Sequence, residues 1–115
     1  MTSGQPWYTG VWTGSADQPT GLITTWTVDV SFVSTGKTGV FAIPTLDCSG
    51  LLTITSSGPN SLSADEVVIK NTDDLCAPDG HMTLTRSGLS GMDMSWQDAA
   101  HPSNTATGTL TRLSS

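Results

Sequence analysis

Apolar and polar residues alternate along the chain with a period of two, and no stretch shows the period of 3.6 residues that marks an amphipathic helix. The clearest case is segment 25–32, where Trp26, Val28, Val30 and Phe32 share one face and Thr, Asp and Ser occupy the other. Such alternation predicts a strand with one buried and one solvated face.

Further segments alternate in the same way, though less regularly, and residues typical of turns separate them. They are 7–14, 39–43, 50–56, 62–70, 81–86, 92–97 and 105–113. Short strands joined by short turns predict an all-β domain, an eight-stranded antiparallel up-and-down barrel, since closure removes exposed sheet edges. The interior of such a barrel has room for side chains or one small ligand. A two-sheet β-sandwich is the alternative, and the short hairpin spacings favour the barrel.

Composition supports a sheet protein in one domain. The chain has 115 residues, of which 36% are apolar and 12% charged, and it contains 19 Thr, 15 Ser and 12 Gly. Thr favours extended backbone, whereas Gly and Ser favour turns. No linker or repeat divides residues 1–115, so we expect a single barrel domain with residues 1–6 as a disordered tail.

The charge balance disfavours two classes of partner. The net charge is −6, with only four Lys and Arg residues, so we expect binding neither to nucleic acid nor to anionic membrane surfaces. No run of about 18 apolar residues exists that would form a transmembrane helix. Residues 1–6 lack the basic and apolar regions of a signal peptide, so an exported form is expected to be a mature fragment or a chain that starts at an added Met.

Cys48 and Cys76 are the only cysteines. They are compatible with one disulfide, worth about 3–4 kcal/mol in an exported protein, or with two buried, reduced thiols; the small core favours the disulfide. Neither lies in a CxxC motif, so a zinc site is not expected.

Catalytic chemistry has little support in the sequence. A nucleophilic triad needs a base, and only His81, on a polar strand face, and His101, in a Pro-containing loop, are available. Asp65 and Glu66 are adjacent on a predicted strand, so they point to opposite faces and do not form a facing carboxylate pair. We therefore predict no catalytic residues and a protein that is not an enzyme.

Asp73, Asp74 and Asp79 form an acidic loop around Cys76 and are a weak candidate for Ca²⁺ binding. Acidic loops are more often simply solvated, so no metal or cofactor is predicted.

The tryptophans provide candidates for ligand binding. Trp12 and Trp26 lie in apolar alternation and are expected in the core. Trp96 lies beside two methionines in a segment that suits either an adaptable core or a soft binding surface, and exposed aromatic rings near the first strand would suit stacking on a ligand. The candidate ligand-binding residues are Trp7, Tyr8, Met92, Met94 and Trp96.

Four motifs carry a family resemblance: YTGVWTG at 8–14, IPTLDCSGLLT at 43–53, CAPDGHMTL at 76–84 and TGTLTR at 107–112. Together they resemble a small β-rich domain of actinobacteria, found alone in exported proteins and at the C-terminal end of some serine/threonine protein kinases. Ile43 stands where that pattern has an aromatic residue. The resemblance implies an extracytoplasmic location, a Cys48–Cys76 disulfide and a sensory or adhesive role. Segment 8–12 is also similar to the G-x-W opening strand of lipocalins and avidins.

Three functional hypotheses follow. The leading one is a secreted or cell-surface, non-enzymatic binding or sensing module for a small apolar ligand, a glycan or a cell-wall component. The second is a protein–protein interaction or assembly domain, and the third is a small barrel enzyme, a cyclase or isomerase, that acts through an apolar pocket without a triad. The longest segments without predicted strands are 15–21, 71–79 and 98–104, where functional side chains on loops are expected first.

Overall fold

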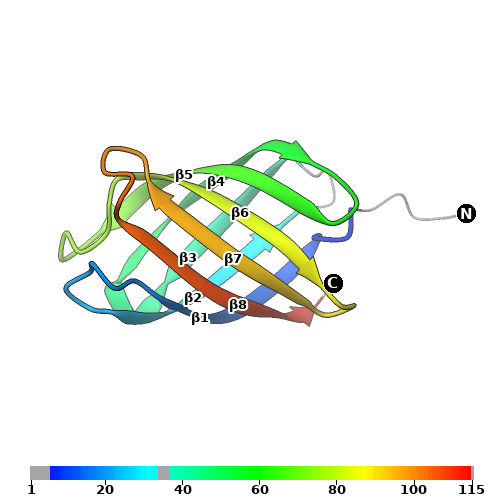
Figure 1. Ribbon diagram of the computed structural model, residues 1–115, viewed down its shortest axis with the longest axis horizontal. Helices are drawn as coiled ribbons and strands as arrows, with labels where there is room; N and C mark the ends of the chain where they lie inside the picture. The colour runs from blue at the N-terminus through cyan, green and yellow to red at the C-terminus, as the bar shows by residue number, and fades with distance from the viewer. Residues whose placement is uncertain (1–5, 34–36, 115) are drawn as a thin grey trace, which may run out of the picture.

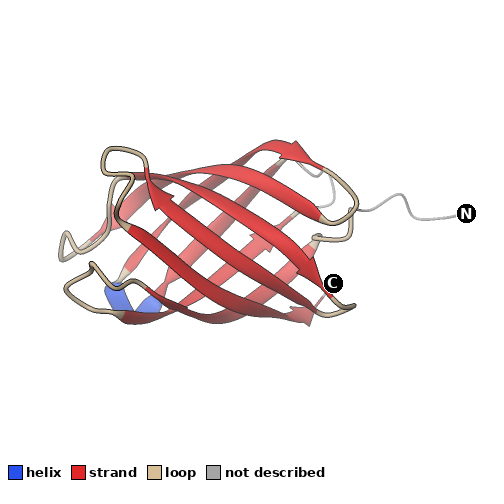
Figure 2. Cartoon of the chain, viewed as in Figure 1, coloured by secondary structure: helices blue, strands red, loops and turns tan. Residues whose placement is uncertain are grey.

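The computed structural model describes residues 6–33 and 37–114, and these form a closed antiparallel barrel of eight strands (Figure 1). Each strand pairs with its neighbours in sequence, and β1 pairs with β8 to close the sheet. The strands are β1 (Gly10–Asp17), β2 (Thr25–Phe32), β3 (Thr38–Ile43), β4 (Cys48–Ser57), β5 (Ser61–Asn71), β6 (Asp79–Ser87), β7 (Gly91–Asp98) and β8 (Thr105–Ser114). A 3₁₀ turn, Pro44–Leu46, precedes β4 and is drawn as a helical segment in Figure 2.

The barrel prediction is confirmed, and the sandwich alternative is wrong. The strand predicted at 25–32 is β2, whereas β1 begins later and ends later than predicted. It extends to Asp17 because this residue pairs with Thr25 on one side and Thr107 on the other, so residues 15–17 belong to a strand rather than a loop. Of the expected tail, residues 1–5 lie outside the described residues, and the Pro6 carbonyl accepts a hydrogen bond from the Thr9 N–H at 3.1 Å.

Side chains that point inward fill the barrel. Large apolar residues from every strand are almost fully buried, so the interior is a packed core. The largest of these side chains are Trp12, Val28, Val30, Phe32, Leu52, Leu62, Leu84, Met92 and Leu110. The outward positions of β1, β6, β7 and β8 carry mostly Thr, Ser, Asp and Gln, which explains the regular alternation in the sequence.

Glycine allows the closing seam between β1 and β8. A Cβ atom on Gly14 would lie 1.9 Å from the Thr109 carbonyl oxygen, and one on Gly108 would lie 2.2 Å from the Ser15 carbonyl oxygen. Neither distance is sterically permitted, so the absence of a side chain lets the two backbones approach closely where the sheet bends.

The two ends of the barrel differ. We call the end with residues 18–24, 44–47, 72–78 and 99–104 the loop end. The end with residues 33, 37, 58–60 and 88–90 is called the terminal end, because β1 begins and β8 ends there (Figure 1). Interlocked rings close the terminal end. Tyr8 packs edge-on against Trp7 and Phe32, with centroids 5.5 and 5.3 Å apart, and the Trp12 indole N–H donates to the Tyr8 carbonyl at 2.9 Å.

The Cys48–Cys76 disulfide is present, and it ties the 72–78 loop to the first residue of β4. Asn71 supports the same loop, because its amide donates to the Cys76 carbonyl at 2.8 Å and accepts from the Cys76 N–H at 3.2 Å. The predicted bridge is therefore confirmed, and it fixes the position of a long loop at the loop end. No helix among the described residues is long and apolar enough to cross a membrane.

Candidate functional site

A small cavity opens at the loop end, and we call it the mouth pocket. Its buried wall comes from Trp26, Ile43, Leu46, Glu66 and Trp96. Its half-buried rim comes from Gln18, Cys76 and Ala77. The cavity volume is about 20 Å³, which is room for about one water-sized group.

Glu66 is the buried carboxyl group of this pocket. It follows Leu62 and Ala64 on the inward face of β5, and only 4% of its surface is exposed. The Trp96 indole Nε1 donates a hydrogen bond to Glu66 Oε1 at 3.2 Å. Burial raises the pKa of the Glu66 carboxyl from 4.5 to about 7; the Trp96 hydrogen bond opposes this shift, and the nearby charge of Asp79 adds to it. The group therefore changes its charge near neutral pH.

Gly80 creates the space in which Trp96 reaches Glu66. Gly80 pairs with Glu66 across β5 and β6, and a Cβ atom at this position would lie 2.2 Å from the Trp96 Nε1 atom. The indole therefore lies against bare backbone. A side chain at Gly80 would displace the indole from the carboxyl group.

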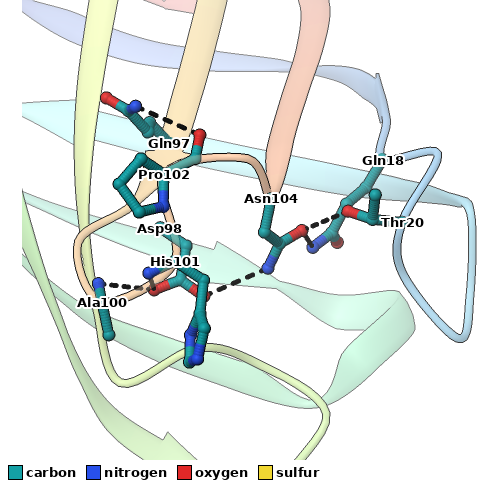
Figure 3. A network of polar contacts seen from close by, with 8 residues as sticks. All are labelled: Gln18, Thr20, Gln97, Asp98, Ala100, His101, Pro102 and Asn104. Atoms are coloured by element: carbon teal, nitrogen blue, oxygen red, sulfur yellow. Dashed lines mark hydrogen bonds and ion pairs between the residues drawn. The ribbon is translucent and has the colours of Figure 1, made fainter.

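The Gln18 side chain at the rim of the pocket is held by hydrogen bonds at both its oxygen and its nitrogen. The Trp26 indole N–H donates to Gln18 Oε1 at 2.9 Å, and Gln18 Nε2 donates to Asn104 Oδ1 at 2.8 Å. Thr20 also donates to Asn104 Oδ1, at 2.6 Å, and Figure 3 shows how Asn104 joins the 18–24 and 99–104 loops. Gln18 thus has a fixed orientation at the pocket.

Asp98 organises the 99–104 loop from the end of β7. Its carboxylate accepts hydrogen bonds from the Ala100 and His101 N–H groups at 2.9 and 3.3 Å and from the Asn104 amide at 3.1 Å (Figure 3). Burial works to raise the Asp98 pKa, but the hydrogen bonds and the nearby His101 outweigh it and lower that pKa below 3.8. Asp98 is therefore a charged anchor for the loop rather than a proton donor.

The structure separates the candidate ligand-binding residues. Met92 and Met94 are buried in the core, and Trp7 and Tyr8 lie at the terminal end. Trp96 alone reaches the mouth pocket.

Sequence reasoning missed Glu66, Trp26 and Gln18 as site residues. The signal for Glu66 was present, because it occupies the inward position of an alternating strand and so puts a carboxyl group among apolar side chains. No local pattern marks Gln18, whose partner Asn104 is 86 residues away.

The other polar candidates lie on the surface. His81 is exposed and its Nδ1 lies 2.8 Å from an oxygen of Asp65, and Asp65 points away from the interior that Glu66 enters, as predicted. Among residues 6–33 and 37–114, no three His, Cys, Asp or Glu side chains gather closely enough to hold a metal ion, and Asp73, Asp74 and Asp79 form no such cluster.

Aliphatic side chains also form an outer stripe across β3, β4 and β5. Val40 lies opposite Leu51, and Leu51 lies opposite Val67, each about half exposed. This stripe lies outside the mouth pocket.

Solved structures resemble the chain in fold. A redesigned β-barrel superimposes with a TM-score of 0.67 at 16% sequence identity, over 92% of this chain and 91% of the other. EF1p2_mFAP2b bound to DFHBI superimposes with a TM-score of 0.64 at 16% identity, over 92% and 94% of the two chains. No protein-family model and no curated protein matches the sequence. The chain thus has the fold of these β-barrels.

Proposed function

We propose that the protein is a binding module that holds a small ligand at the loop end, with the ligand's head group in the mouth pocket. The observation that carries this proposal is the burial of the Glu66 carboxyl group among apolar side chains at the mouth of the barrel. Burying a carboxyl group with one side-chain hydrogen bond costs free energy, and such groups concentrate at functional sites. The fold itself would be satisfied by an apolar residue at this position.

The packed interior limits what can bind. A cavity of about 20 Å³ admits a head group, not a lipid chain or a sugar ring, so the body of the ligand lies outside, against the 18–24 and 72–78 loops. Among proteins of similar fold, EF1p2_mFAP2b binds the small molecule DFHBI, which supports small-molecule binding by a barrel of this kind.

The disulfide supports a location outside the cytoplasm, because disulfides persist in oxidising compartments. The resemblance to an exported actinobacterial domain supports the same location.

The indole resonances of the four tryptophans report where a ligand binds, and so they test the proposed function. Trp26 and Trp96 belong to the mouth pocket, whereas Trp7 and Trp12 lie at the terminal end and are internal controls. A panel of small molecules is titrated against ¹⁵N-labelled protein while the indole N–H resonances are recorded. We expect a binding ligand to shift the Trp26 and Trp96 resonances and leave the other two in place. Shifts confined to Trp7 and Trp12, or no shift with any class of compound, would contradict the proposal.

Glu66 also favours a second candidate function, the small barrel enzyme. A carboxyl group with a pKa of about 7 exchanges protons readily at neutral pH, as a general acid or base must. In that case turnover of a bound compound is abolished in Glu66→Gln while its binding is retained. A ligand recovered unchanged after long incubation with the wild-type protein counts against this candidate.

A further inference from the structure

We infer that the mouth pocket receives the protonated primary amino group of a small organic amine, with the Glu66 carboxylate as its partner; this inference rests on the binding function proposed above. Four observations support it: the free hydrogen-bond acceptors of the pocket, its indole walls, its small volume and the negative charge of the loop end.

The side chains of the pocket offer mainly acceptors, because most of their donors are already engaged. The Trp96 indole N–H donates to Glu66, the Trp26 indole N–H donates to Gln18, and the Gln18 amide donates to Asn104. What remains for a ligand is mostly acceptors: the carboxylate of Glu66 and the carbonyl oxygen of Gln18, which have further lone pairs, beside the second N–H of the Gln18 amide. A hydrogen-bond donor is therefore the ligand group that these side chains suit best.

The walls select an organic cation over a metal ion. Two indole side chains, Trp26 and Trp96, border the cavity, and the electron-rich face of an indole attracts an ammonium group. Hard metal ions such as Ca²⁺ need six to eight oxygen ligands, whereas among the lining side chains only Glu66 and Gln18 carry oxygens. One carboxylate and one amide carbonyl among apolar groups do not supply such a shell.

The size of the cavity restricts the cation to a compact one. A volume of about 20 Å³ holds a group similar in size to water, which fits a terminal –NH₃⁺. A quaternary ammonium or a guanidinium is several times larger. The rim of Gln18, Cys76 and Ala77 then contacts the first carbons of the amine.

Acidic residues gather at the loop end and most basic residues lie at the terminal end, so the charge distribution attracts a cation to the pocket. Seven of the ten acidic residues border the loop end or its pocket: Asp17, Asp47, Glu66, Asp73, Asp74, Asp79 and Asp98. Of the four Lys and Arg residues, only Lys70 lies there, and it is paired with Asp47 at 3.0 Å. Lys37, Arg86 and Arg112 lie at the terminal end. An acidic mouth raises the local concentration of cationic ligands and speeds their association.

The test uses three probes of similar shape: n-butylammonium, n-butanol and butyrate. Each is titrated at pH 8 while the Trp96 and Trp26 indole resonances are followed. The variants are Glu66→Gln and a matched control, Asp65→Asn, which removes the same charge from the neighbouring, outward-facing position. Both substitutions change the net charge equally, so only the location of the carboxylate differs.

We expect butylammonium to bind wild type and Asp65→Asn alike and to bind Glu66→Gln about 10- to 100-fold more weakly, since a charge-assisted hydrogen bond is lost. Butanol and butyrate should bind the wild type more weakly than the amine does. Equal binding of the three probes, or undiminished amine binding by Glu66→Gln, overturns the amine inference but leaves the pocket as a binding site. If none of the probes nor any compound of the wider panel moves Trp96 or Trp26, the proposed function fails as well.

Discussion

The guanidinium carbon of Arg112 lies 4.3 Å from the centroid of the Trp12 ring, so a side chain of β8 covers a ring of β1 at the terminal end of the barrel. The same guanidinium donates to the carbonyl oxygens of Trp7 and Thr9, each at 2.5 Å. One side chain therefore holds the entry of the chain into β1 and shields its largest buried ring.

Arg112→Gln should lower the free energy of unfolding by about 2–3 kcal/mol, because it removes two charge-assisted hydrogen bonds and a cation–π contact. Urea unfolding followed by tryptophan fluorescence measures the loss. Arg86→Gln is the matched control: the Arg86 guanidinium lies 5.9 Å from the Trp7 ring and makes one hydrogen bond, of 3.3 Å, so a loss of under about 1 kcal/mol is expected. Equal losses in the two variants would mean that Arg112 has no special role.

The stability of the barrel should fall as the pH rises from about 4.5 to about 7, because of Glu66. In this window the unfolded chain releases the Glu66 proton, with an ordinary pKa of 4.5, while the folded protein retains it up to a pKa of about 7. The free energy of unfolding then decreases by up to about 3 kcal/mol and stays level above the window. The nearby charge of Asp79, at the start of β6, adds to the rise of the Glu66 pKa. The residues that pair with Glu66 on the neighbouring strands, Leu52 and Gly80, carry no charge.

Glu66→Gln isolates this effect from that of the other carboxylates. Asp47 and Asp98 have lowered pKa values, so they contribute stability above their ordinary pKa of 3.8 that is lost as the pH falls through the lower folded value. The variant keeps these contributions and a neutral acceptor for Trp96. It should match wild type at pH 4 and exceed it by about 3 kcal/mol at pH 8, as measured by urea unfolding at each pH. A constant difference between the two proteins across this range would refute the role of Glu66.

Removal of the disulfide should lower the free energy of unfolding by about 3–4 kcal/mol, since the bridge closes a loop of 28 residues in the unfolded chain. The Cys48→Ala/Cys76→Ala variant should also shift the Trp96 indole resonance, because Cys76 and Ala77 border the mouth pocket. Dithiothreitol should reproduce both changes in wild type and have no effect on the double variant. An unchanged Trp96 resonance would show that the bridge stabilises the fold without shaping the pocket.

Asn104→Ala should loosen the loop end. It removes the hydrogen bonds from Gln18 and Thr20 and the bond to Asp98, at a cost of about 1–3 kcal/mol. Since Gln18 also holds the Trp26 indole, the Trp26 resonance should move while that of Trp12 does not. Gln97→Ala is the control, because Gln97 makes one exposed hydrogen bond, to the Pro102 carbonyl, and should cost under about 1 kcal/mol. Proton–deuterium exchange in residues 99–104 reports the loosening locally.

Alternation of apolar and polar residues was sufficient to predict the strands and the closed barrel. In a barrel, every second residue of a strand faces the core and is apolar, while its neighbours face solvent. It was insufficient for the ends of the strands: Asp17 belongs to β1 through pairing with Thr25 and Thr107, and Thr107 is remote in sequence. Trp96 was identified as a candidate, while its partner Glu66 was considered only for an acid pair. The cavity results from three-dimensional packing around Trp26 and Leu46, which no periodicity encodes.

The opposite construction of the two ends has a consequence for how such a chain can evolve. At the terminal end, the Trp7, Tyr8 and Trp12 rings and the Arg112 guanidinium hold the two ends of the chain together. The pocket, in contrast, is bordered by loops that follow β1, β3, β5 and β7 (Figure 1). On the proposed binding function, substitutions at other positions of the 18–24 and 99–104 loops than Gln18 and Asn104 would change the ligand that is bound and leave the pairing of β1 with β8 intact. One scaffold would then serve for different ligands.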